Sequence, residues 1–143
     1  LGPGSLTVDF VKSIFIAASG LKAQNGRMRI IAENIANADS TGRTPQEDPY
    51  RRKIPTFSAE LDRKLQAEVV ELGPVEYDRS EFKTRYEPGH PAADERGYVR
   101  TPNVETLVEM VDMREAQRSY EANLNLISAT RRMLQKTIEI LRA

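Results

Sequence analysis

The stretch TPNVETLVEMVDMREAQRSYEANLNLISATRRMLQKTIEILRA, residues 101–143, decides the fold, because it contains neither Pro nor Gly after its second residue. Thr101-Pro102-Asn103 supplies cap residues around a Pro that is tolerated in a first helical turn, and Glu105 suits the positive end of the helix dipole. We expect one long C-terminal helix within a segment bounded at residues 100–143. Its stripe keeps alternating three- and four-residue steps: Met110, Met113, Gln117, Tyr120, Leu124, Ile127, Arg131, Leu134, Ile138 and Leu141.

A second helix is predicted near the other end of the chain, over residues 6–37, which contain no Pro. Its apolar positions again follow a four-three step: Phe10, Ile14, Ala17, Leu21, Met28, Ile31 and Ile35. Gly20 and Gly26 each weaken it by about 1 kcal/mol relative to Ala, so this helix should depend on a partner surface. Turn-forming residues end it, and the N-terminal segment covers residues 6–42. Residues 1–5 resemble the remnant of a cleaved expression tag and are set aside.

The middle segment, residues 43–99, contains six prolines and supports only a small β element with long loops. Leu61 and Leu65 are four residues apart and indicate a short helix over residues 58–66. Alternating side chains predict short strands over residues 68–72 and 82–86. The predicted fold is therefore mainly α with a small β element. We expect it to be elongated, with the two terminal helices packed as a coiled-coil-like hairpin beside a loop-rich middle segment.

The length of the C-terminal helix favours assembly over a self-contained fold. A helix of about 40 residues is roughly 60 Å long, whereas a compact chain of this size has a diameter of roughly 37 Å. We predict that the stripes meet within a subunit and across subunits, through Ile14, Leu21, Met28, Ile31 and Ile35 on the first helix and Tyr120, Leu124, Ile127, Leu134 and Ile138 on the second. The simpler alternative is a helical hairpin in which these residues form only its own core.

Composition argues against most binding and catalytic chemistry. The chain has 21 basic and 21 acidic residues, a balance atypical of nucleic-acid-binding proteins. It has no Cys and one His, so no zinc cluster, cofactor site or catalytic set is predicted. The longest unbroken apolar run, residues 14–18, is far shorter than the roughly 18 residues that cross a bilayer, so no membrane insertion is expected. Asp9 and Lys12 argue against a cleaved secretory signal.

The end of the first helix carries a motif of a known family. Asn34-Ile35-Ala36-Asn37-Ala38-Asp39-Ser40-Thr41-Gly42 resembles the signature of bacterial flagellar rod and hook proteins, in which Thr commonly stands at the position of Ser40. Later motifs resemble the proximal-rod members, in matched order over nearly the whole chain. The motif residues are Asn34, Asn37, Gly42, Pro49, Tyr50, Arg51, Arg52, Lys53, Pro88, Gly89, His90, Pro91, Gly97, Tyr98, Pro102 and Asn103.

The resemblance implies a non-enzymatic structural subunit of the flagellar basal-body rod, which crosses the periplasm. The implied partners are other rod subunits, copies of the same chain and the flagellar type III export apparatus, with export that requires no cleaved signal. Two alternatives remain open at this point. One is a cytoplasmic helical-hairpin adaptor or export chaperone, and the other is a periplasmic wall-cleaving enzyme, for which no isolated carboxylate pair is evident.

Overall fold

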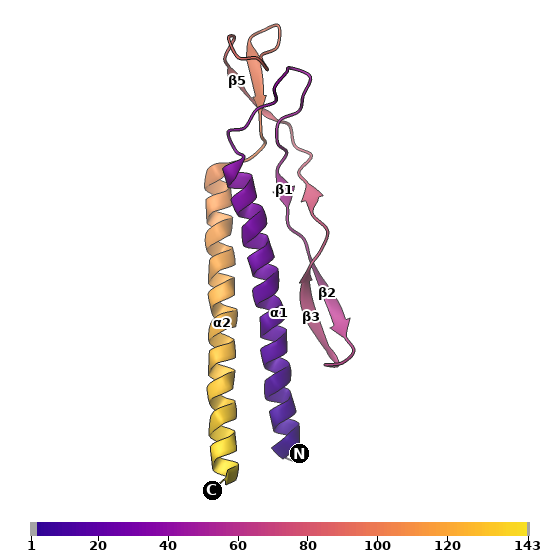
Figure 1. The fold of residues 1–143 in the computed structure, drawn as a ribbon, viewed down its shortest axis with the longest axis vertical. Helices are drawn as coiled ribbons and strands as arrows, with labels where there is room; N and C mark the ends of the chain where they lie inside the picture. Colours follow the sequence, from indigo (N-terminus) through magenta and orange to yellow (C-terminus); the bar gives the residue numbers. More distant parts are fainter. Residues whose placement is uncertain (1–2, 143) are drawn as a thin grey trace. The chain divides into compact units, whose positions relative to one another are not determined.

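The computed structural model describes residues 3–142 and has two long helices and six short strands (Figure 1). In chain order the elements are α1 (Pro3–Ala36), β1 (Lys53–Ile54), β2 (Phe57–Asp62), β3 (Ala67–Leu72), β4 (Glu76–Tyr77), β5 (Lys83–Tyr86), β6 (Tyr98–Thr101) and α2 (Thr106–Arg142). The predicted fold class is confirmed, because two helices pack against each other and the intervening segment holds only a small amount of β structure.

The chain divides into two compact units, and each helix contributes to both. The described residues of unit 1 are 3–27, 57–73 and 115–142. Unit 2 consists of Met28–Thr56 and Pro74–Arg114.

In unit 1, small side chains let α1 approach its neighbours closely. A Cβ atom at Gly20 would lie 2.9 Å from Nδ2 of Asn123 on α2, so the side chain of Asn123 packs directly against α1 at this position. On α1, Ala17 and Ala23 are buried, as are Ala116 and Thr130 on α2. The fully buried positions of this helix pair are therefore small side chains, apart from Thr130, which is of moderate size.

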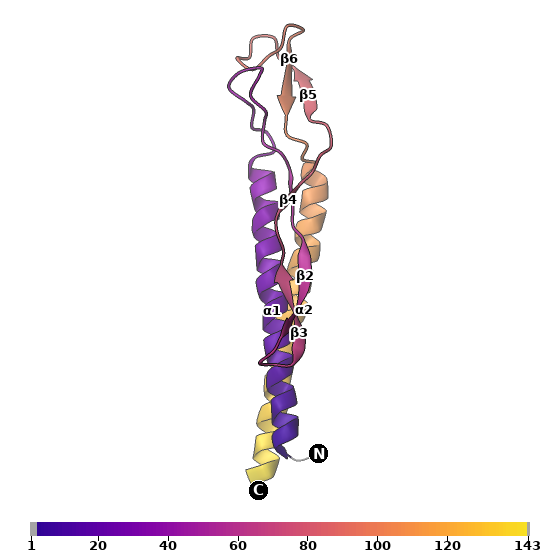
Figure 2. The same cartoon turned by 90° about the vertical axis from the view of Figure 1, so that its right-hand side faces the viewer.

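The hairpin of β2 and β3 packs on α1 within unit 1 (Figure 2). The strands are antiparallel, with Phe57 opposite Leu72 and Asp62 opposite Ala67. The backbone N–H of Val70 donates to Oγ of Ser19, at 3.2 Å. Unit 1 therefore has three components, with α1 between α2 and the hairpin (Figure 1).

Unit 2 contains the other two strand pairs and most of the large buried side chains. β1 pairs with β4, and β5 pairs with β6, each in antiparallel orientation. The buried apolar residues of the unit are Ile30, Ile31, Ala92, Val99 and Val104. These side chains come from α1, from the loop before β6, from β6 and from the approach to α2, so the core connects segments that are far apart in the chain.

Two local predictions are wrong. The short helix over residues 58–66 is instead strand β2 followed by a turn, in which Oδ1 of Asp62 accepts the backbone N–H groups of Lys64 and Leu65. Pairing with β3 outweighs the four-residue spacing of Leu61 and Leu65, because that spacing is a weak signal in a short segment. The cap at Thr101 is also wrong: Thr101 belongs to β6, opposite Lys83, and α2 begins at Thr106.

The strands predicted over residues 68–72 and 82–86 are confirmed as β3 and β5. The first helix begins before residue 6, at Pro3, because Pro is tolerated at a first helical position. By length and composition, Gly4–Ala36 is long and apolar enough to cross a membrane, which the longest unbroken apolar run did not indicate. This length and composition do not by themselves indicate a membrane span, because core helices of soluble proteins and signal sequences near an N-terminus share them.

Candidate functional site

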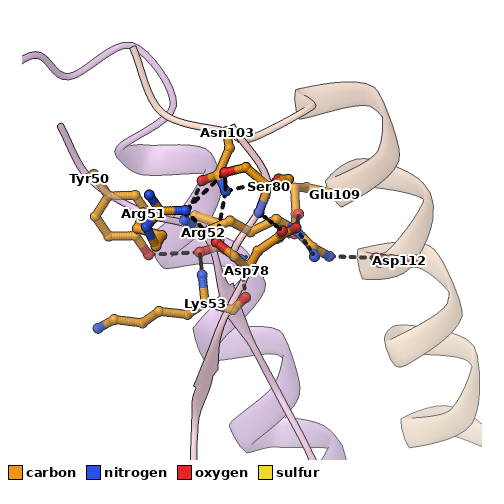
Figure 3. A network of polar contacts seen from close by, with 10 residues as sticks. Tyr50, Arg51, Arg52, Lys53, Asp78, Ser80, Asn103, Glu109 and Asp112 are labelled. Carbon is orange, nitrogen blue, oxygen red and sulfur yellow. Dashed lines mark hydrogen bonds and ion pairs between the residues drawn. The ribbon is translucent and has the colours of Figure 1, made fainter. Parts of the chain in front are cut away.

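Unit 2 contains a network of polar side chains that we call the polar junction, formed by Asn34, Tyr50, Arg51, Arg52, Lys53, Asp78, Ser80, Asn103, Glu109 and Asp112 (Figure 3). Six of these are predicted motif residues that lie apart in the sequence. The structure brings them together at the start of α2, where the end of α1, the residues around β1 and the chain around β4 converge.

Asn34, at the end of α1, uses its side-chain amide as a peptide group would. Its Nδ2 donates to the carbonyl oxygen of Lys53 at 2.9 Å, and its Oδ1 accepts the backbone N–H of Lys53 at 3.0 Å. The Tyr50 hydroxyl also donates to Oδ1, at 2.7 Å. The residue is fully buried, so these bonds form where water does not compete. Only an amide side chain offers both a donor and an acceptor at this length, which explains Asn at this position.

Arg52 and Glu109 form the ion pair at the centre of the junction. Nε of Arg52 donates to Oε1 of Glu109, whose side chain is 1% exposed. The guanidinium also lies 3.3 Å from Oδ2 of Asp78 and 3.8 Å from Oδ2 of Asp112. Burial alone would lower the pKa of Arg52, but the hydrogen bond to Glu109 and the nearby carboxylates raise it overall. One cation thus joins α2 to the segment after β4.

Asn103 holds the backbone on the other side of this ion pair. Its Oδ1 accepts the N–H of Arg52 at 2.8 Å, and its Nδ2 donates to the carbonyl oxygen of Asp78 at 3.0 Å. Arg51 donates to the same carbonyl at 2.7 Å and stacks over the ring of Phe82, 4.2 Å from its centroid. Two asparagines therefore fix the path of residues 50–53: Asn34, which precedes the middle segment, and Asn103, which follows it.

Three further groups have pKa values that the junction changes. Burial, followed by the negative charges of Glu33 and Glu109, raises the pKa of Tyr50 to about 12. Hydrogen bonds from the backbone and side chain of Ser80 lower the pKa of Asp78, with Arg52 adding to the effect. The hydrogen bond to Glu33 raises the pKa of Lys53. At neutral pH each group is held in its usual state, so none is prepared to exchange a proton.

The polar groups of the junction pair mainly with one another and with the backbone. Within residues 3–142, every buried side-chain N or O atom has a hydrogen-bond partner, and no cluster of three His, Cys, Asp or Glu residues could hold a metal ion. The carboxylates of the junction are engaged with Arg52 and with backbone groups. The network therefore positions the chain segments that converge on it.

Comparison with known proteins identifies the family. The family model described as "Flagella basal body rod protein" matches residues 14–43, and that described as "Flagellar basal body rod FlgEFG protein C-terminal" matches residues 95–140. The flagellar basal-body rod protein FlgC of Agrobacterium fabrum is 54% identical over 128 residues, which cover 90% of this chain and 92% of that protein. The chain belongs to the FlgC family.

More distant FlgC proteins agree with this assignment. FlgC of Aquifex aeolicus is 41% identical, over 92% of this chain and 97% of that protein. FlgC of Salmonella typhimurium is 40% identical, over 87% of this chain and 92% of that protein. The resemblance drawn from the sequence motifs is therefore confirmed, and it covers both helices and the segment between them.

The remaining motif residues of this FlgC-family chain support turns around the polar junction. Gly42 is buried, and a Cβ there would overlap the carbonyl oxygen of Glu47. Gly97 has a φ of 89°, a conformation that disfavours other residues. Its neighbour Tyr98 makes an edge contact with Tyr86, with ring centroids 5.3 Å apart.

His90 lies in one of these turns. Its Nδ1 accepts the N–H of Ala92 at 2.9 Å, and its Nε2 lies 3.3 Å from Oγ1 of Thr41. Pro49 and Pro102 are buried, and Asn37 donates to the carbonyl oxygen of Glu33 at the end of α1. The exposed motif residues of the same region are Pro88, Gly89, Pro91 and Tyr98.

The predicted assembly residues fall into two groups in the FlgC-family structure. Ile31 is buried, and the half-buried members are Ile14, Leu21, Met28, Ile35, Tyr120, Ile127 and Leu134. Leu124 and Ile138 are instead 45% and 41% exposed. Some α2 residues of the predicted interface are therefore partly covered by the chain itself, and others are exposed to solvent.

The covered face of α2 is centred one residue earlier than the predicted stripe. Its buried positions are Glu109, Ala116 and Thr130, and the half-buried Asn123 completes the seven-residue spacing. Hydrophobic counting missed them because two are polar, one is charged and one is only a methyl group. The available signal was the seven-residue repeat itself, in which each small or polar residue is followed four positions later by a larger apolar or aromatic one.

Proposed function

We propose that this chain is a structural subunit of the bacterial flagellar basal-body rod that assembles with copies of itself and with other rod subunits. The observation that carries the proposal is the similarity to FlgC proteins along about nine-tenths of the chain. The matched region also covers more than nine-tenths of those relatives. A structural role also agrees with the polar junction, whose groups bind one another and hold the backbone.

Assembly through the helices agrees with the exposed apolar side chains that both helices carry. Phe15 on α1 is 53% exposed, and Leu107 and Ile140 on α2 are 77% and 75% exposed. Burying one such side chain in a neighbour would contribute about 1.5–3 kcal/mol. We assign the half-buried residues of the predicted interface to the contact within a subunit, and Leu124 and Ile138 to contacts between subunits.

The proposed route to the rod is through the flagellar type III export apparatus, without a cleaved signal. The absence of Cys from all 143 residues suits a chain that is threaded unfolded and then refolds without oxidation. In this account the subunit resides in the basal body, needs no cofactor, performs no enzymatic reaction and binds no nucleic acid. Its work is to transmit torque through many parallel contacts.

Deletion of the gene in its source bacterium tests the function. We expect non-motile cells whose basal bodies lack a rod by electron microscopy, and restoration of both by the wild-type gene. If the chain is instead a cytoplasmic adaptor or chaperone, it will be absent from purified basal bodies and recovered in a stable cytoplasmic complex. Motile deletion cells with intact rods would contradict the proposed function.

A further inference from the structure

The β2–β3 hairpin presents an apolar face that unit 1 covers only in part, where Leu72 lies against Gly26 of α1. Phe57, Leu61 and Val70 are 43%, 64% and 41% exposed. Residues directly opposite each other in the register share a face, and Ala59 is opposite Val70 while Leu61 is opposite Glu68. Because three large apolar side chains gather on one face of a two-stranded element, this face has the composition of a contact surface.

The hairpin also carries exposed negative charge. Glu60, Glu68 and Glu71 are exposed, and none of them forms an ion pair with another residue in the described range 3–142. Glu68 is on the apolar face itself, beside Leu61. A partner for this face should therefore combine apolar side chains with nearby positive charge.

The C-terminal half of α2 has that combination on a flank next to its covered face. Leu126, Met133 and Ile140 are seven residues apart and are 51%, 56% and 75% exposed. Arg132 and Lys136 accompany this stripe, are exposed, and form no ion pair among residues 3–142. The stripe and the hairpin face are complementary in both hydrophobicity and charge.

The two surfaces cannot satisfy each other within one copy of unit 1. There α1 lies between α2 and the hairpin (Figure 1), and the large apolar side chains of both surfaces are exposed. A surface that meets a different surface of an identical neighbour forms a head-to-tail contact, which repeats from copy to copy. The arrangement leaves one such surface free on each side of α1.

We propose that the β2–β3 hairpin of one copy docks on the stripe of α2 formed by Leu126, Met133 and Ile140 in a second copy. In this contact Glu68 faces Arg132, and Leu61 and Phe57 cover the apolar stripe. The proposal rests on the proposed function, because it specifies how identical subunits meet during rod assembly.

Cysteine cross-linking tests the contact, since the chain itself has no Cys. Cells that lack the native gene would carry two copies, one with Leu61→Cys and one with Met133→Cys. We expect oxidised basal bodies to yield a band at about twice the chain mass only when both variants are present. Each variant alone, and the pair Lys64→Cys with Glu121→Cys, are controls that should give no such band.

Charge exchange provides a second test that does not depend on cysteine. We expect Glu68→Arg to reduce rod assembly and motility, and Arg132→Glu in the same chain to restore both. Glu121→Lys, an exposed change on another part of α2, should have no effect. Purified Glu68→Arg protein should keep its wild-type circular dichroism spectrum, so that loss of assembly is separated from loss of folding.

The possible outcomes separate this inference from the proposed function. Intact rods and motile cells without the mixed cross-link would overturn the docking contact and leave the rod function standing. A hairpin that cross-links only to a different rod protein would also overturn it, because the occupant would not be a second copy. If the cysteine variants make no rods, the charge exchange decides, and failure of Arg132→Glu to restore assembly refutes the contact.

Discussion

The two compact units are stabilised in different ways. In unit 2, directional hydrogen bonds of Asn34 and Asn103 surround the ion pair of Arg52 and Glu109. In unit 1, the side chain of Asn123 packs against Gly20, and the buried positions of the two helices are small residues. Directional bonds specify one arrangement of the chain. A contact between small residues sets the distance between two helices but does not select which side chains pair across it. The comparison explains why the family motif residues gather in unit 2.

The largest expected loss of stability comes from breaking the central ion pair of unit 2. Arg52→Met leaves Glu109 buried without its cation, so we expect the free energy of unfolding to fall by about 3–5 kcal/mol. Urea denaturation followed by circular dichroism measures the change. Lys83→Met is the matched control, because Lys83 pairs with Glu105 at an exposed position and should contribute at most about 1 kcal/mol. Equal losses in the two variants would show that the junction does not dominate unit 2.

The next largest effect should appear in the seam of unit 1. Ile127 is half-buried, so Ile127→Asp should lower the free energy of unfolding by about 2–3 kcal/mol, through lost apolar burial and the cost of a charge there. Leu124 is 45% exposed, and Leu124→Asp should change stability by no more than about 0.5 kcal/mol. Thermal melts of the two purified variants measure the difference. If Leu124→Asp also destabilised the protein, Leu124 would belong to the covered face of α2, as the apolar periodicity of the sequence predicts.

A smaller loss is expected at the turn after α1. The Cβ introduced by Gly42→Ala would overlap the carbonyl oxygen of Glu47, and backbone atoms can move away less easily than the end of a side chain. We expect a loss of about 1–2 kcal/mol in unfolding free energy, measured by urea denaturation. Gly89→Ala is the control, because nothing lies within 4 Å of its Cβ and the change should be neutral. A neutral Gly42→Ala variant would mean that the turn adjusts freely.

The smallest effect concerns the pH dependence of unit 2. Hydrogen bonds from Ser80 lower the pKa of Asp78, so the unfolded chain binds a proton at that position more readily than the folded chain. The stabilisation is therefore complete above the ordinary pKa of about 4 and is lost as the pH falls through the folded value. Melting temperatures measured from neutral pH down to pH 3 should decline less steeply for Asp78→Asn than for the wild type. Parallel curves would contradict this assignment.

Much of the fold could be predicted from the sequence, because long helices leave a repeated pattern. The absence of Pro and Gly after Pro102 was enough to predict α2, although the start of the helix was misplaced: Thr101 pairs in β6 through a contact that is not local. The helix expected over residues 58–66 failed for the same reason, since pairing with β3 is invisible in a single short segment.

The site was predictable only in part. Motif resemblance selected Asn34, Arg52 and Asn103, but it did not select Glu109, the buried residue to which Asn34 and Arg52 both donate. A carboxylate in the first turn of a helix has an ordinary explanation in the helix dipole, so nothing local marked Glu109 as buried. The covered face of α2 was missed for a related reason, because Asn123 and Thr130 are polar residue types that usually face solvent.

The measurement that most directly tests the central claim is electron microscopy of basal bodies from cells whose only copy carries Leu124→Asp. This change lies outside the covered face of α2, so the subunit should fold while its contact with neighbours is lost. We predict a protein with wild-type stability, cells that do not swim and basal bodies without a complete rod. Rods of normal length and motile cells would contradict the proposal that Leu124 contacts neighbouring subunits in the rod.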